Sequence, residues 1–115
     1  MTIAAKKPDL FSRNLRLPKK YEVYLTRHAQ EDLERIFCYV ANDSIDNATN
    51  FVIELEEKVN SLEDLPNRNP FIPENEYFGT DYRHLIYEKY RIICRVLEYS
   101  VFISRIIHGA KLLEL

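Results

Sequence analysis

The last third of the chain holds three short segments rich in Tyr, Ile, Val and Phe, at about residues 82–88, 90–98 and 100–108. Side chains of these types favour β-strands. The connections between the segments, near Glu88-Lys89 and Glu98-Tyr99-Ser100, are only a few residues long. Parallel strands need a crossover of a dozen or more residues, so these connections allow only antiparallel hairpins. The sequence therefore predicts a three-stranded antiparallel meander.

Two stretches before the meander show a helical repeat of apolar residues. The first covers about residues 27–42, with Thr26 placed as its N-cap. The second begins near Ile45 and is expected to end at Pro66. Since only a few residues separate them, the two stretches predict an antiparallel helical hairpin.

A strand is expected before the hairpin and a loop after it. Residues 21–26 alternate between apolar and polar side chains, as a strand does. Residues 66–81 are rich in Pro and Asn, which predicts a loop whose apolar members pack onto the domain: Phe71, Ile72, Tyr77 and Phe78. The order predicts an α+β domain over residues 21–115, β-α-α-β-β-β, with the hairpin packed on one face of an antiparallel sheet.

Charge is distributed unevenly along the 115 residues. Residues 1–20 carry six Lys or Arg against one Asp, whereas residues 21–80 carry four against thirteen Asp or Glu. We therefore interpret residues 1–20 as a basic arm that precedes an acidic domain. No apolar run is long enough to span a bilayer and the start lacks a secretory signal, so the expectation is a cytoplasmic protein without a membrane segment.

Strand alternation assigns side chains to the two faces of the meander. One set, which includes Cys94 and Val96, is expected to face the core. Arg91 and Arg95 belong to the other set and are expected to point outward. In residues 100–108 both faces are partly apolar, so alternation does not decide which is inside. Both cysteines, Cys38 and Cys94, are expected to be small buried residues in a reducing compartment.

The meander resembles a known family. The strings Tyr82-Arg-His-Leu-Ile-Tyr-Glu-Lys-Tyr-Arg-Ile-Ile-Cys-Arg-Val96 and Val101-Phe-Ile-Ser-Arg-Ile-Ile-His-Gly109 are similar to the meander of the RelE/ParE toxins of type II toxin–antitoxin modules. The opening Tyr24-Leu-Thr-Arg-His-Ala-Gln-Glu-Asp-Leu33, with a small residue before an acidic-Leu pair, is similar to the family's strand-into-helix start. The likeness covers about residues 21–112. It implies a RelE-like fold, a cognate antitoxin as partner, and no cofactor or metal.

Two chemistries occur in this superfamily. The RelE branch implies a metal-independent endoribonuclease that cuts mRNA on the ribosome, for which cations near the phosphate and an acid or base are needed. Its catalytic candidates here are Arg83, Arg91, His108 and Lys111. Leu85 stands where a second catalytic Lys is expected, and the C-terminal Tyr segment of that branch is missing. The nuclease set is therefore incomplete.

The ParE branch is the closer resemblance and implies a toxin that poisons DNA gyrase. Its candidate target contacts are Arg91, Arg95, His108 and Lys111. Apolar residues on the open side of the meander would suit an antitoxin cover: Ile93, Leu97 and Ile103. A third alternative is a degenerate member that binds its antitoxin and poisons nothing. The plainest structural alternative for each Arg is a weak ion pair along the sheet with Glu88 or Glu98.

Overall fold

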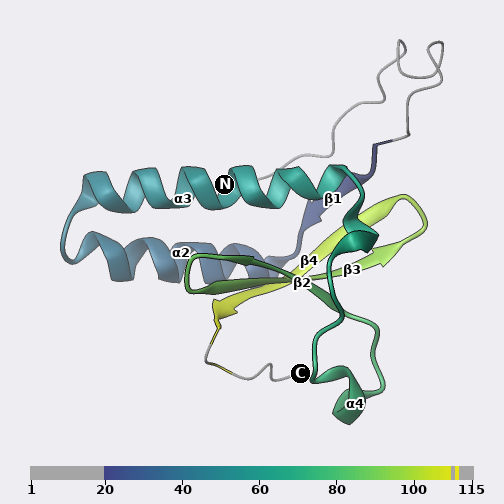
Figure 1. Ribbon diagram of the computed structural model, residues 1–115. Helices are drawn as coiled ribbons and strands as arrows, with labels where there is room; N and C mark the ends of the chain where they lie inside the picture. Colours follow the sequence, from purple (N-terminus) through teal and green to yellow (C-terminus); the bar gives the residue numbers. More distant parts are fainter. Residues whose placement is uncertain (1–19, 110, 112–115) are drawn as a thin grey trace, which may run out of the picture.

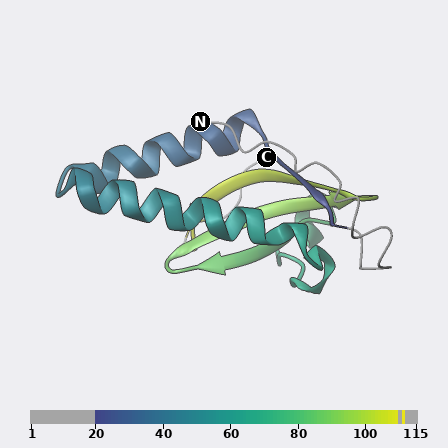
Figure 2. The same cartoon turned by 90° about the horizontal axis from the view of Figure 1, so that it is seen from above.

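The computed structural model describes residues 20–109 and residue 111, so most of the predicted basic arm lies outside the described residues. A helical hairpin packs on one face of a four-stranded sheet (Figure 1), which confirms the predicted fold class. From above, the hairpin runs across the sheet and extends beyond one side of it (Figure 2). The main elements are β1 (Glu22–Leu25), α2 (Arg27–Ala41), α3 (Ile45–Asn60), β2 (Arg83–Tyr87), β3 (Tyr90–Leu97) and β4 (Ser100–His108).

Both helices begin at a hydroxyl side chain. The Thr26 hydroxyl accepts a hydrogen bond from the Ala29 amide at 3.3 Å and donates to the Ile103 carbonyl at 2.6 Å. The predicted cap is therefore confirmed, and it also fastens the start of α2 to β4. Ser44 caps α3 in the same way. The α-helix ends at Asn60, before the predicted end at Pro66, because the chain tightens into the 3₁₀ turn η1 (Ser61–Glu63).

The sheet has the order β1-β4-β3-β2. The meander pairs antiparallel as predicted, but β1 runs parallel to β4, with Glu22 opposite Ser100 and Leu25 opposite Ile103. The expectation of a wholly antiparallel sheet was thus wrong in this one pairing. The physical reason is the long connection between β1 and β4, which includes the whole hairpin and is ample for a crossover.

A bulge in β4 explains why alternation could not assign its faces. Ile93 lies opposite Arg105 and Cys94 lies opposite Ile103, so Ser104 has no partner of its own on β3. One extra residue reverses the inside–outside alternation along the strand. As a result Ile103 and Ile106 both belong to the core beneath the hairpin.

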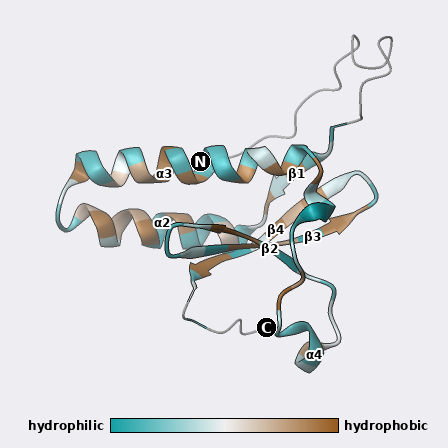
Figure 3. Ribbon diagram, in the orientation of Figure 1, coloured by the Kyte–Doolittle hydropathy of each residue, from teal (hydrophilic) through white to brown (hydrophobic). Residues whose placement is uncertain are grey.

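The main core lies between the hairpin and the sheet. Hydrophobic and hydrophilic residues alternate along both helices (Figure 3), and the hydrophobic ones supply this core. Cys94 is fully buried there and Val96 packs against it, as predicted. Cys38 was expected to be buried but is exposed. Its place on α2 lies outside the stripe of buried residues, Ala29, Asp32, Leu33 and Ile36, that faces the core.

Both turns of the meander contain a strained residue. Glu88 and Glu98 each have a φ of 53°, in the left-handed region that favours glycine or asparagine. These positions join β2 to β3 and β3 to β4 by two-residue loops. Turns that match the sheet's twist need such a conformation. Each turn therefore has the backbone conformation that the hairpin needs, at a residue type that disfavours it.

Replacing Glu88 should show the strain directly. We expect Glu88→Gly to raise the free energy of unfolding by about 0.5–1 kcal/mol, because removing the side-chain penalty of the left-handed region outweighs the entropy cost of glycine. Lys89→Gly is the matched control, since Lys89 is not at positive φ. It should lower stability by about 0.5–1 kcal/mol. Urea unfolding of both variants measures the two effects, and equal signs would contradict the strain.

Candidate functional site

The sheet face opposite the hairpin is covered by the segment that links α3 to β2. This cover includes η2 (Pro66–Arg68) and α4 (Asn75–Phe78). Ile72 of the cover packs with Ile93 and Ile107 in a second, smaller core. Of the four residues predicted to pack onto the domain, Ile72 is confirmed, while Phe71, Tyr77 and Phe78 are exposed. The cover therefore closes this face over Arg91, Ile93 and Ile107, while Arg95 and Leu97 stay exposed.

Arg91 lies beneath this cover. Its side chain was expected to point outward into solvent but is only 7% exposed. Its two terminal nitrogens bind the Glu74 carboxylate, Nη1 to Oε1 at 3.1 Å and Nη2 to Oε2 at 2.5 Å. Alternation gave the correct face, and it could not show that Glu74 of the loop would close over that face. The bidentate geometry is the strongest form of such a pair.

The same guanidinium contacts two further segments. Nη2 donates to the Lys111 carbonyl at 3.0 Å, and Nη1 lies 3.4 Å from Nδ1 of His84 on β2. Nε is the one buried side-chain nitrogen or oxygen without a partner in the described part of the chain. Arg91 therefore joins the loop, β2 and the chain that follows β4.

His84 responds electrostatically to this cluster. Burial lowers the pKa of His84 below its usual value of 6.5, the positive charge of Arg91 lowers it further, and Glu74 opposes the change. The neutral imidazole is thus the favoured form beside the guanidinium. A proton on His84 would place two cations side by side.

Arg83 is also committed to the loop. Its Nη1 donates to the carbonyls of Asn67 at 2.9 Å and Asn69 at 2.6 Å. Its guanidinium also lies over the Phe71 ring, 3.9 Å from the centroid. These contacts hold the start of the cover against β2. Among the proposed nuclease residues, Arg83 and Arg91 both have structural partners.

The remaining predicted contact residues are exposed but do not lie together. Arg95 forms an exposed ion pair with Asp81 at 3.1 Å, rather than with Glu88 or Glu98. His108 and Lys111 lie at the other end of the sheet, where the His108 ring meets the edge of Tyr90. Arg95 is five positions after Tyr90 in β3, which corresponds to about 17 Å along a strand. Three of the four target-contact candidates therefore lie at one end of the sheet, where Arg91 is buried beside the Lys111 carbonyl, and Arg95 lies toward the other end.

Two of the three antitoxin-contact candidates are buried. Ile93 belongs to the small core under the loop, and Ile103 belongs to the main core beneath the hairpin. Neither is solvent-accessible, so the expectation that they form an exposed apolar side was wrong. The loop covers Ile93, and the bulge at Ser104 places Ile103 beneath the helices. Leu97 is exposed, as expected.

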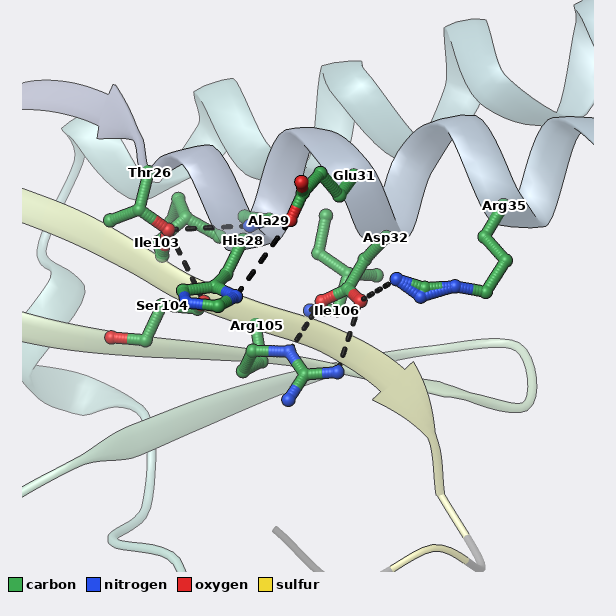
Figure 4. Close-up of polar contacts among 10 residues, drawn as sticks. All are labelled: Thr26, His28, Ala29, Glu31, Asp32, Arg35, Ile103, Ser104, Arg105 and Ile106. Carbon is green, nitrogen blue, oxygen red and sulfur yellow. Dashed lines mark hydrogen bonds and ion pairs between the residues drawn. The ribbon is translucent and has the colours of Figure 1, made fainter. Parts of the chain in front are cut away.

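A second ion-pair cluster, not expected from the sequence, joins α2 to β4 (Figure 4). The buried Asp32 carboxylate accepts from Arg105 Nε at 2.8 Å, Arg105 Nη2 at 3.1 Å and the Ile106 amide at 2.9 Å. Arg35 adds a longer contact of 3.4 Å. The acidic residue before Leu33 was visible only as part of the family resemblance. Arg105 and Ile106, its closest partners, are more than seventy residues away, so no local pattern could identify them.

The geometry limits what chemistry this surface can perform. A nuclease needs accessible cations beside the scissile phosphate. Arg91 is buried and neutralised by Glu74, and Arg83 is occupied by loop carbonyls. Within residues 20–109 and 111, no group of three His, Cys, Asp or Glu side chains could hold a metal ion.

A helical hairpin on a sheet of this topology is found in a known class of toxins. The family described as the ParE toxin of the type II toxin–antitoxin system parDE matches residues 23–113. This match covers most of the chain, and the chain therefore belongs to the ParE toxin family.

A solved structure shares the fold. It is described as the chromosomal ParDE TA system from P. aeruginosa, and its matching chain is 24% identical with a TM-score of 0.63. The match covers 77% of the present chain and 96% of the other. A search of curated proteins gave no match. In the part of the chain that the structure describes, no helix is long and apolar enough to cross a membrane.

Removing Glu74 should strongly destabilise the fold. We expect Glu74→Ala to lower the free energy of unfolding by about 3–5 kcal/mol, because the Arg91 cation would stay buried without its partner. Asp81→Ala is the matched control. It removes the exposed partner of Arg95 and should cost less than about 1 kcal/mol. Chemical denaturation measures both, and similar losses would contradict the central role of the buried pair.

His84 should make stability depend on pH. Because the pKa of His84 is lower in the folded chain, the unfolded chain binds the proton more readily below about pH 6.5. The free energy of unfolding should therefore fall as the pH drops from about 7 toward 5. His84→Gln should reduce that slope. A variant that only lost packing would shift the whole curve and keep the slope, which urea unfolding at several pH values distinguishes.

Proposed function

We propose that this ParE-type toxin acts on DNA gyrase in the cytoplasm and that a cognate antitoxin holds it inactive. The observation that carries the proposal is the burial of Arg91 against Glu74 in a chain of the ParE family. The cation that an RNA-cleaving relative would need at the phosphate is here part of the protein interior. A target bound through protein surfaces fits better than a target that is cleaved.

The exposed candidates define where gyrase would be contacted. His108 is the last residue of β4, and Lys111 comes three residues later. The Arg91 hydrogen bond to the Lys111 carbonyl fixes the backbone there. A backbone that is already fixed loses little further conformational entropy on binding. We propose this end of the sheet as the main contact and Arg95, at the other end, as a secondary one.

The antitoxin would cover the apolar residues that the fold leaves in water. Leu97 is 42% exposed and Tyr99, in the adjacent turn, is 52% exposed. Both lie at the end of the β3–β4 hairpin, away from His108. Exposed apolar groups of this kind are a liability for a chain on its own and suit a stable partner.

Inducible expression without the antitoxin tests the target. We expect an SOS response and covalent gyrase–DNA complexes, with messenger RNA left intact. Codon-periodic cuts in messages on ribosomes would replace this proposal with the ribonuclease. Normal growth, with folded protein present in the cells, would leave a degenerate antitoxin-binding protein.

Exposed variants test the contact surface without disturbing the fold. In a purified gyrase cleavage assay, His108→Ala combined with Lys111→Ala should raise the toxin concentration needed about five- to thirtyfold, as expected for the loss of about 1–2 kcal/mol of binding. Arg27→Ala, an exposed Arg on α2, is the matched control and should act like the unchanged chain. Equal potency of all three proteins would place the contact elsewhere. Arg91→Ala is unsuitable, since it removes a buried structural partner.

A further inference from the structure

The outer face of α3 leaves apolar side chains uncovered. Ile45 is 66% exposed and Ile53 is 48% exposed, although the helix buries a separate stripe in the core. Residues eight apart lie on the same side of a helix, two turns from each other. The helix therefore carries one apolar row toward the core and a second, shorter one toward solvent.

Acidic residues flank this exposed row. Asp46, Glu56 and Glu57 belong to α3, and none of them forms an ion pair with another described residue. Partial burial raises the pKa of Glu56, because burial disfavours the charged form of its carboxylate. A nearby cation would stabilise that charged form. Glu54, by contrast, accepts a hydrogen bond from Tyr87. The outer face thus combines exposed isoleucines with uncompensated negative charge.

Residues 1–19 have the complementary composition. They carry five Lys or Arg against one Asp, together with six larger apolar side chains, Met1, Ile3, Leu10, Phe11, Leu15 and Leu17. These residues lie outside the described ones, so complementarity here is a matter of sequence. Basic and apolar side chains in one segment suit a surface that is both acidic and apolar.

The described chain begins next to the end of α3. Lys20 Nζ lies 3.1 Å from Glu63 Oε1, and the Tyr21 amide donates to the Glu63 carbonyl at 2.9 Å. Glu63 belongs to the turn that follows α3 directly. The 16 residues of α3 span about 24 Å. Nineteen extended residues reach about 60 Å, so residues 1–19 are long enough to follow α3 back to the turn of the hairpin.

We propose that residues 1–19 dock along the outer face of α3, with their basic side chains against Asp46, Glu56 and Glu57 and their apolar ones over Ile45 and Ile53. The Lys20–Glu63 ion pair is the first contact of this interface. The proposal concerns the chain itself and does not depend on the target of the toxin. It would account for the uneven distribution of charge along the sequence.

A spin label on the full-length chain tests the docking. Cys38 is exposed near the end of α2, whereas Cys94 is buried and burial raises the pKa of its thiol to about 11. A nitroxide reagent should therefore label Cys38 alone. At about 3.3 Å per extended residue, about seven residues before Lys20 cover the length of α3, so Arg13 would lie nearest the hairpin turn. We expect Ser12, Arg13 and Asn14 to lose most of their amide NMR intensity, with a smaller loss toward Lys19.

Charge reversal gives the matched comparison. Glu56→Lys with Glu57→Lys should restore the intensities of the arm. Adding Arg16→Glu with Lys19→Glu, the basic residues that would lie beside Glu56 and Glu57, should bring the loss back. Glu76→Lys, an exposed acid on α4 across the sheet, should change nothing. Unaffected arm signals in the unchanged chain would overturn the proposal, as would a loss that survives the reversal. Signal loss in unlabelled chains mixed with labelled ones would assign this face to a second copy instead.

Discussion

The bidentate ion pair between Arg91 and Glu74 is the interaction on which the second face of the sheet depends. Burying an unpaired charge costs several kcal/mol, so the loop must bring its carboxylate to this one place on β3. The loop then shields Ile93 and completes the small core. Through the Lys111 carbonyl, the same guanidinium also fixes the chain that follows β4.

Asp32 has the corresponding role on the hairpin side. Strand β1 ends opposite Ile103, and beyond that point no strand of the described residues lies beside this edge of β4. There the Asp32 carboxylate accepts hydrogen bonds from the Ile106 amide and from Arg105, so a side chain replaces the strand that would otherwise pair with this amide. Asp32 thus attaches the hairpin to one face of the sheet, and Glu74 attaches the loop to the other. Each carboxylate accepts hydrogen bonds from buried donors that would otherwise lack a partner.

These contacts bear on function because they occupy most of the cationic side chains on the sheet. A phosphate-binding surface needs free guanidinium groups, and here Arg91 and Arg83 serve the fold. The accessible residues lie at the two ends of the sheet, as suits contacts with large protein partners. Positive charge is concentrated in residues 1–19 of the sequence, which we propose to dock on the acidic outer face of α3.

The amino-acid sequence alone determined the elements and their order, because helix caps such as Thr26, the apolar repeats and the two short turns are local signals. It also placed Cys94 in the core by strand alternation, and the family signature in the meander indicated the ParE family. Only the tertiary structure decided which sheet face was open, that β1 pairs parallel with β4, and that a bulge at Ser104 buries Ile103. The burial of Arg91 belongs to the same group, because its partner lies seventeen residues away in a loop. Contacts across such separations depend on how covers and strands meet in space, which no local pattern records.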